Sequence, residues 1–234
     1  RLKLAVSSAG LKLRFVRAYE LNRLGDERQP VTLLAIVQRD PDGDGPLVTS
    51  VFEATAHTSA VRTYTRLCSE EPYPVEAVSS MNATLPMEAA KLEDAQAQVY
   101  WGESSWDCEN AWQSAPLRST TLRDRNQVIN PGMSSARFAR RSTSTWSTGE
   151  FEMGIVEGGG RPGELGHFSF AWQIEHNGAW EWEIGEDDPG LRVSAYGPEY
   201  DDHQWFIMLR DNQPFVTVPV SFVVCAGDWQ HAVA

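Results

Sequence analysis

The chain has 234 residues, of which 41% are hydrophobic and 22% charged, and its formal net charge is −12. This length and composition fit one large globular domain with a substantial core. The acidic excess argues against nucleic acid and against an anionic membrane as partners, because both require a basic surface. The three cysteines, Cys68, Cys108 and Cys225, lack the spacing of a metal site, so we expect free thiols and no metal or other cofactor.

The amino-terminal part of the chain predicts a series of strands. Apolar residues close to alternation indicate strands at residues 11–19, 31–37, 48–56, 60–67 and 75–81. Residues 40–46, which are rich in Asp, Gly and Pro, predict a loop between two of them. Residues 86–98 are the one stretch whose Ala, Glu, Lys and Leu content favours a short helix before the next strand.

The composition changes from residue 99 onward, because all nine tryptophans lie between Trp101 and Trp229. Residues 99–112 mix Trp with Glu, Asp and Asn, which suits sugar rings that stack on indole and bind carboxylates through their hydroxyls. Surfaces that dock a second domain also use Trp. The candidates for a carbohydrate site or a domain interface are Trp101, Trp106, Glu109, Trp112, His176 and Asn177.

Residues 168–185 form the central feature, because two alternating runs flank the dipeptide Asn177-Gly178, a strong hairpin signal. A three-residue loop at 176–178 places every large apolar side chain on one face. The pairs expected from that register are Ile174 with Trp180, Trp172 with Trp182 and Phe170 with Ile184. Glu175, Glu181 and Glu183 then share the opposite face, which we interpret as acidic and solvated.

The remaining segments complete an all-β prediction. Residues 118–141 are polar and basic and suggest a long excursion, and residues 158–163 form a glycine-rich connection. Strands are expected at residues 191–196, 205–209 and 215–224, where Pro219 suggests an edge strand or a bulge. The expected fold is a large antiparallel β-sandwich with little helix, formed as a single domain by residues 1–234.

No catalytic motif is evident in the sequence. It contains no nucleophile elbow, zinc-binding helix motif or phosphate loop, and the five histidines are scattered. Two of the glutamates between residues 175 and 183 are conceivable as a glycosidase pair, but a solvated strand face is the commoner meaning of such alternation. We therefore assign no catalytic residue.

Several segments together resemble the amino-terminal domain of glycoside hydrolase family 36 α-galactosidases, especially the form seen in actinobacteria. The matching stretches are VYWGESSWDCENAW (99–112), STSTWSTGEF (142–151), AWQIEHNGAWEWEIG (171–185) and the run from 191 to 222. The resemblance covers about two thirds of the chain. It implies a β-supersandwich of the galactose-mutarotase type, packed in the full enzyme against a catalytic (β/α)8 barrel.

In that family both catalytic carboxylates lie on the barrel, as a retaining pair. The resemblance therefore implies a non-catalytic domain of a bacterial, cytoplasmic enzyme that acts on α-galactoside sugars. Its expected partners are the barrel and, in oligomeric members, a second copy of the chain.

Two alternatives remain open from the residues. A free-standing aldose epimerase would need a His and a Glu in one cleft, for which His176 or His167 with Glu175 are available. A carbohydrate-binding, lectin-like module would need exposed tryptophan rings.

Overall fold

A computed structural model describes residues 9–24, 29–85, 97–105, 107–120, 137–143, 149–160, 164, 166–187 and 190–234. Trp106 and almost all of the helix expected at 86–98 lie outside the described residues. None of the helices in the described ranges is both long and apolar enough to cross a membrane.

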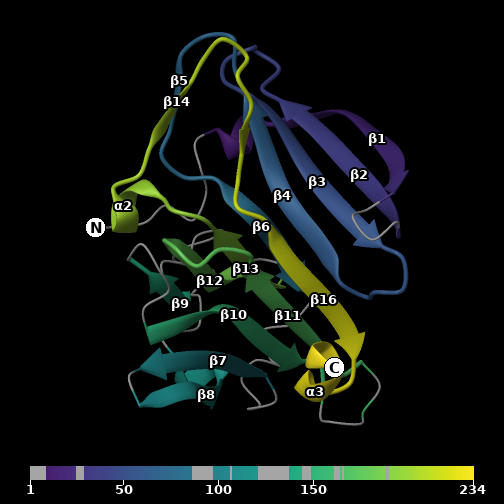
Figure 1. The fold of residues 1–234 in the computed structure, drawn as a ribbon, viewed down its shortest axis with the longest axis vertical. Coiled ribbons are helices and arrows are strands. Elements are labelled where there is room, and N and C mark those ends of the chain that lie inside the picture. The colour runs from purple at the N-terminus through teal and green to yellow at the C-terminus, as the bar shows by residue number, and fades with distance from the viewer. Residues whose placement is uncertain are drawn as a thin grey trace, which may run out of the picture.

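Two antiparallel sheets form the body of the molecule (Figure 1). The large sheet has the order β1 (Arg14–Leu24), β2 (Pro30–Arg39), β3 (Leu47–Thr55), β4 (Val61–Cys68), β16 (Val220–Ala226), β11 (Phe168–Ile174), β10 (Gly149–Gly158), β7 (Gln98–Ser105) and β8 (Cys108–Pro116), and the short β15 (Phe215–Val216) also pairs with β4. The small sheet has the order β6 (Ser79–Leu85), β13 (Gly190–Tyr196), β12 (Trp180–Asp187) and β9 (Arg137–Ser142).

Few other elements are described. β5 (Tyr73–Val75) pairs with β14 (Ile207–Leu209), and the helices are η1 (Gly10–Lys12), η2 (Leu117–Ser119), α2 (Tyr200–His203) and α3 (Trp229–Val233). The predicted fold class, a large antiparallel β-sandwich with little helix, is confirmed. The three cysteines are free, as expected.

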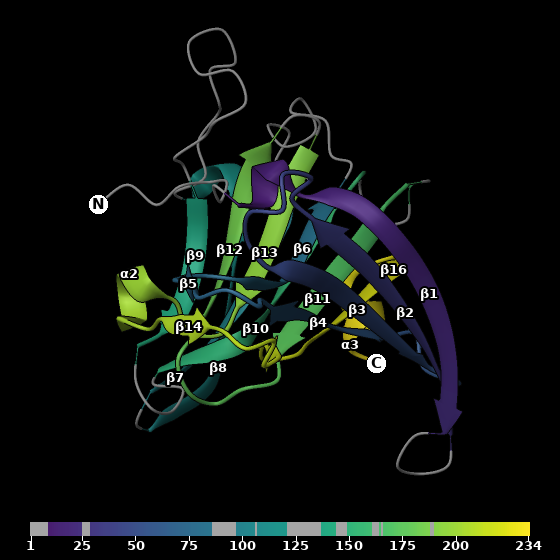
Figure 2. The ribbon, with the colours of Figure 1, turned by 90° about the horizontal axis from the view of Figure 1, so that it is seen from above.

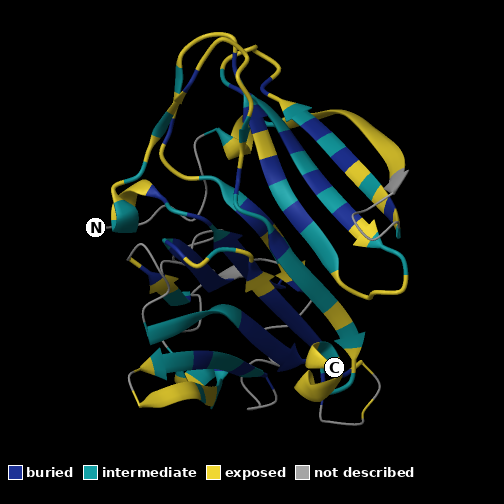
Figure 3. Ribbon diagram, viewed as in Figure 1, coloured by how far each residue is buried: buried dark blue, intermediate teal, exposed yellow. Residues whose placement is uncertain are grey.

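The hydrophobic core lies where the small sheet covers β11, β10 and β16 of the large one. Trp172 on β11 and Trp180 and Trp182 on β12 are at most 1% exposed, and Figure 3 shows both strands as almost continuously buried. The rings of Trp172 and Trp182 meet edge to face, with centroids 5.1 Å apart. Aromatic pairs of this geometry add to the stabilisation that burial alone gives.

The hairpin predicted for residues 168–185 is wrong. β11 pairs with β10 and β16 in the large sheet, whereas β12 pairs with β13 and β9 in the small one. Residues 175–179 therefore cross from one sheet to the other. Trp172 and Trp182 do face each other, but across the core and not as cross-strand neighbours in one sheet. Alternating apolar residues are expected both in a hairpin and in two strands that face each other across a core, so the pattern fits either arrangement.

Two other expectations need correction. β16 is a central strand between β4 and β11 and not an edge strand, and Pro219 lies in the break between β15 and β16, where its carbonyl accepts from the Glu175 amide. The basic excursion expected at 118–141 contains strand β9 at its end. The arginines of β9 obscured its strand character, and they bind carboxylates of β12, β10 and α2.

Gly154 on β10 is required by the core. A Cβ atom built at this position would lie 2.5 Å from Cζ2 of Trp172. We therefore expect Gly154→Ala to lower the free energy of unfolding by about 1–3 kcal/mol, because the indole must shift in a packed core. Urea unfolding measures this loss. The phenylalanine of Trp172→Phe lacks the clashing atom, so Gly154→Ala should cost much less stability in that background. Additive losses in the double-mutant cycle would contradict the proposed clash.

Strands β1, β2 and β3 extend to one side, beyond the small sheet (Figure 2). The inner face of β4 packs against β6, because Thr63 and Thr65 donate to the carbonyls of Ser80 and Ser79. Alternation then places Arg62, Tyr64 and Arg66 on the outer face of the large sheet. Both faces of the β1–β3 region carry exposed side chains, among them Tyr19, Leu21 and Leu34.

Candidate functional site

Trp101 lies on β7 and faces the small sheet. Its ring packs edge to face against Phe138 of β9, with centroids 5.1 Å apart, and the Arg140 guanidinium lies 4.7 Å from the Trp101 ring centre. The indole Nε1 donates to Oε1 of Glu103 at 3.1 Å. The ring face is thus covered by a protein cation, which is an arrangement of stacking rather than an open platform for a sugar.

Two carboxylates complete this arrangement, which we call the Trp101 cluster (Trp101, Glu103, Phe138, Arg140 and Glu150). Glu103 and Glu150 are directly opposite each other on β7 and β10, and Arg140 Nε lies 3.4 Å from Glu150 Oε2. Burial raises the pKa of Glu150, Arg140 opposes this shift, and Glu103 adds to it. The cluster offers hydrogen-bonding carboxylates beside an indole, at the edge where β7 and β9 face each other.

Trp112 lies on the opposite face from Trp101, because its cross-strand partner on β7 is Gly102. Trp112 is 41% exposed, donates through Nε1 to Asn110 Oδ1 at 3.0 Å, and packs its edge against Phe151. Glu109 is exposed near the same hairpin end. The structure therefore separates Trp101 from Trp112, and Trp106 lies outside the described residues.

His176 and Asn177 belong to the connection between the two sheets. The His176 ring lies over Gly178, where an added Cβ would approach within 2.6 Å of Nε2, and Asn177 is exposed. Their neighbour Glu175 accepts two hydrogen bonds from Arg62 Nε and one from the Ser221 hydroxyl. The three glutamates expected on one face are thus separated, since Glu175 in the connection binds residues of the large sheet while Glu181 and Glu183 lie on β12 of the small one.

Sequence reasoning missed an ionic cluster on the outer face of the small sheet. Glu183, which is 2% exposed, lies 2.6 Å from Arg137 of β9, 3.4 Å from Arg192 of β13 and 2.7 Å from the Tyr196 hydroxyl. Burial would raise the pKa of Glu183, but the charge of Arg137, hydrogen bonds from Tyr196 and Arg137, and the charge of Arg192 hold it below its ordinary value. The sequence signal for it is the pair of arginines at 137 and 141, which lie on one face of β9.

A second carboxylate group on this side includes Glu181, Glu199 and Asp202, whose oxygens lie within 4.8 Å of one another. Glu199 caps α2 by accepting from the amides of Asp201 and Asp202, and Arg141 lies 2.8 Å from Asp202 and 3.7 Å from Glu181. The Arg141 guanidinium thus supplies the positive charge that a metal ion would supply. The geometry is that of a structural ion-pair group.

Two His–Glu pairs lie within the described ranges. His203 Nδ1 is 3.8 Å from Glu199 Oε1 at α2, and the other pair lies at the end of the large sheet. His167 Nε2 lies 3.0 Å from Glu157 Oε1, and both side chains are buried, at 2% and 8% exposure. Glu157 also accepts from the Trp229 amide of α3 and from the Tyr100 hydroxyl. Burial and Glu157 raise the pKa of Tyr100 to about 12. The pair is enclosed under α3 and serves to hold that helix.

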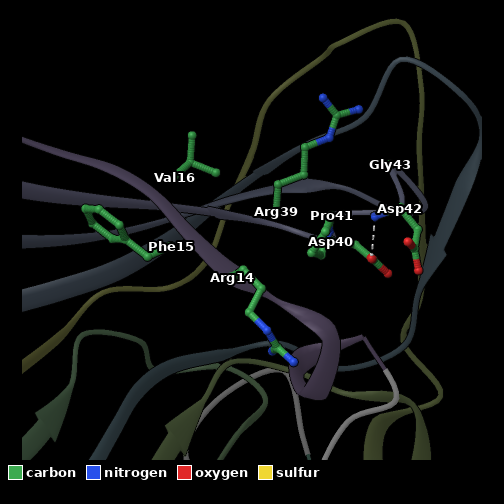
Figure 4. A pocket seen from close by; sticks show the side chains of 8 residues that line it. All are labelled: Arg14, Phe15, Val16, Arg39, Asp40, Pro41, Asp42 and Gly43. Carbon is green, nitrogen blue, oxygen red and sulfur yellow. Dashed lines mark hydrogen bonds between the residues drawn. The ribbon is translucent and has the colours of Figure 1, made fainter.

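A shallow pocket of about 370 Å³ lies at the end of β1 and β2 (Figure 4). Asp40 lies within it, 5% exposed, and accepts from the Asp42 amide. Arg14 turns back to donate to the carbonyls of Leu11 and Leu13, and Figure 4 shows Arg39 extending away from it. The pocket is polar on one side and is bordered by the exposed Phe15 and Val16 on the other.

Comparison with known proteins gives a fold but no close relative. No protein-family model and no curated protein matches the chain. Among solved structures it is similar to the family 36 α-galactosidase AgaB from Geobacillus stearothermophilus, with TM-score 0.73, 17% identity, and coverage of 94% of this chain and 28% of the enzyme. A variant of AgaA from the same organism, in complex with 1-deoxygalactonojirimycin, gives TM-score 0.74, 17% identity, and coverage of 98% and 30%.

The galactosidase domain of the α-galactosidase-sucrose kinase AgaSK gives TM-score 0.71 at 15% identity, with coverage of 95% of this chain and 28% of that one. The chain therefore spans less than a third of the length of the enzymes that it matches. The region matched in these enzymes is the amino-terminal one. At this identity the likeness shows the fold, which is the fold that the resemblance implied.

Proposed function

We propose that this chain is the amino-terminal, non-catalytic domain of an α-galactosidase-like retaining glycoside hydrolase. The observation that carries the proposal is the match over 94% of this chain to only 28% of a family 36 enzyme. In that proposal the domain supports a catalytic barrel, contributes oligomer contacts, and lines the rim of the sugar site. The comparisons lend no support to an actinobacterial type, so the proposal does not extend to it.

The described carboxylates agree with a supporting role. Glu183 is bound by two arginines and a tyrosine, Glu157 by His167 and α3, and Glu199 by the amides of α2. Retaining hydrolysis needs one ionised and one protonated carboxyl group about 5–5.5 Å apart with access for a sugar. Glu103 and Glu150 of the Trp101 cluster are the half-exposed exception, and Arg140 and Trp101 already bind them.

Neither alternative is favoured by a specific observation. An epimerase needs an accessible acid–base pair. The His167–Glu157 and His203–Glu199 pairs are both buried, and Glu175 is bound to Arg62 rather than to a histidine. A lectin-like platform needs open indole rings, and Trp101 is covered by Arg140 while Trp112 lies on the other face. We retain Trp112, Glu109 and Asn177, which are exposed, as candidates for contact with the barrel or with sugar.

The test is hydrolysis of p-nitrophenyl α-galactoside by the purified 234-residue chain and by the longer polypeptide that contains it. We expect release of p-nitrophenol only from the longer polypeptide. Activity that stays with the isolated chain through purification would contradict the proposal. Glu150→Gln is then the informative variant, since loss of that activity would assign it to the Trp101 cluster rather than to a contaminant. A longer polypeptide that hydrolyses no galactoside would also contradict it.

A further inference from the structure

The outer face of strands β1 to β4 is ordered in rows that run across the four strands. In each row, directly opposed residues have their side chains on the same face of the sheet. Successive rows are two residues apart, about 6.8 Å, and β1 and β4 are separated by three strand spacings, about 14 Å. The rows are Arg17–Val37–Thr49–Arg66, Tyr19–Ala35–Val51–Tyr64 and Leu21–Leu33–Glu53–Arg62.

In the first two rows, the outer strands of this face carry long side chains and the inner strands carry smaller ones. Ala35, Val37 and Val51 are at most 5% exposed, although no described element packs along this face, whereas Tyr19 is 40% and Leu21 54% exposed. The face therefore carries arginines at one end and tyrosines in the middle. At the other end it carries leucines beside the Arg62–Glu53 ion pair. Exposed aromatic and aliphatic side chains gathered on one face are a feature of interaction sites.

The charges on this face are not neutralised by the chain. Arg62 lies 3.3 Å from Glu53 and 2.8 Å from Glu175, so it is compensated. Arg17, Arg66 and Arg39, which follows Val37 on the same face, are exposed, and within the described residues no carboxylate forms an ion pair with any of them. In a molecule of net charge −12, these three exposed arginines can therefore pair with carboxylates of a binding partner.

We propose that the outer face of β1–β4 docks an acidic, extended segment of a partner protein. The carboxylates of the segment would bind Arg17, Arg66 and Arg39, and its apolar side chains would pack on Tyr19, Tyr64 and Leu21. An extended chain laid along the strands has the same two-residue period as the rows, so acidic, aromatic and aliphatic side chains at alternate positions meet successive rows. This inference does not depend on the glycosidase assignment.

The apolar end of the face favours a protein over an anionic glycan. Sugars stack on aromatic rings, as Tyr19 and Tyr64 would allow, but the exposed Leu21 and the half-buried Leu33 beyond them offer no hydrogen bond to hydroxyls. Aliphatic side chains next to aromatic ones, rimmed by arginine, have the composition of a protein–protein interface.

The test uses fluorescence anisotropy of a fluorescein-labelled peptide, Glu-Glu-Ser-Phe-Ser-Leu-Gly, titrated with the 234-residue chain. We expect saturable binding that weakens at about 0.5 M NaCl, where charges are strongly screened. Arg17→Glu with Arg66→Glu should weaken it by about tenfold or more, and Tyr19→Ala by several-fold. Arg210→Glu, the same substitution at one exposed arginine outside the three rows, is the control and should leave binding nearly unchanged.

Each outcome of the peptide titration either supports or overturns the proposed docking. Circular dichroism of the variants confirms that they are folded, which their exposed positions favour. The proposal is overturned if the peptide shows no binding up to about 1 mM, which marks the weak end of specific affinities. It is equally overturned if the double variant binds as the original chain does. Polygalacturonate that binds this face while the peptide fails to compete would assign the face to a glycan, and concentration-dependent dimers abolished by Arg17→Glu would assign it to a second copy.

Discussion

Trp182→Ala should lower the free energy of unfolding by about 3–5 kcal/mol, the range for truncating a large aromatic in a packed core. Trp182 is fully buried, and its ring contacts Trp172 of the opposite sheet at 5.1 Å and Phe138 of β9 at 5.8 Å. Its loss removes the contact that joins the two sheets at the centre of the core. Urea unfolding followed by circular dichroism measures the effect.

Trp112→Ala is the matched control for this change. Trp112 is 41% exposed and touches Phe151 at the periphery, so we expect a loss of about 1 kcal/mol or less. Trp182→Phe is a sharper probe, because no acceptor in the described part of the chain binds the buried Nε1 of Trp182. Removing an unsatisfied donor offsets part of the stability lost with the packing. Trp182→Phe should therefore lower the free energy of unfolding by less than half as much as Trp182→Ala. Equal losses for Trp182→Ala and Trp112→Ala would contradict the assignment of the core.

The same tryptophans show how far the sequence determined the fold. Alternation predicts correctly that Phe170, Trp172 and Ile174 share a face and that Trp180, Trp182 and Ile184 share another. It even predicts that Trp172 meets Trp182. It does not separate a hairpin from two strands that face each other across a core, because both arrangements place the same side chains together. The Asn177-Gly178 dipeptide led to the prediction of a hairpin. In the structure, β11 instead pairs with β16, which is some fifty residues away in the sequence.

The candidate site shows a different limit. Trp101 and Trp112 are close in sequence, but one hairpin with Gly102 opposite Trp112 sends them to opposite faces, and that register depends on the turn after Ser105. The rows of the β1–β4 face cannot be read from the sequence either, since Arg17 and Arg66 come into one row only through three successive strand registers. The local sequence pattern predicts which side chains share one face of a strand. Which strands bring these faces together into a site depends on pairing between residues far apart in the sequence.

Glu183 reverses an expectation about charge. The sequence suggested a solvated acidic face on residues 175–183, but Glu181 and Glu183 are at most 2% exposed. The reason lies on other strands, because Arg137 comes from β9 and Arg192 from β13. Arg192 also lies over Gly185, where an added Cβ would approach within 2.8 Å of the guanidinium. Burial of a charged carboxylate is costly unless cationic or hydrogen-bonding partners surround it, and the partners of Glu183 come from residues distant in sequence.

Glu183→Gln should therefore lower the free energy of unfolding by about 3–5 kcal/mol, because it leaves Arg137 and Arg192 as buried charges without their counter-charge. Glu20→Gln, the same substitution on the exposed β1, is the matched control and should change stability by about 0.5 kcal/mol or less. Thermal unfolding at pH 7 distinguishes them. Comparable shifts in the two variants would show that the cluster contributes nothing beyond surface charge.

The pH dependence of stability provides a second and independent test of Glu183. Its folded pKa lies below the unfolded value of about 4.3, so its contribution is present above that pH and is lost as pH falls through the folded value. Tyr196 works in the opposite direction, since burial and Glu183 raise its pKa well above 10, and its contribution is lost as pH rises through that value. Between pH 7 and 3 the stability of Glu183→Gln should fall less steeply than that of the original chain. Parallel curves would mean that the carboxylate is no better stabilised in the folded state than in the unfolded one, contrary to its two arginines and its tyrosine.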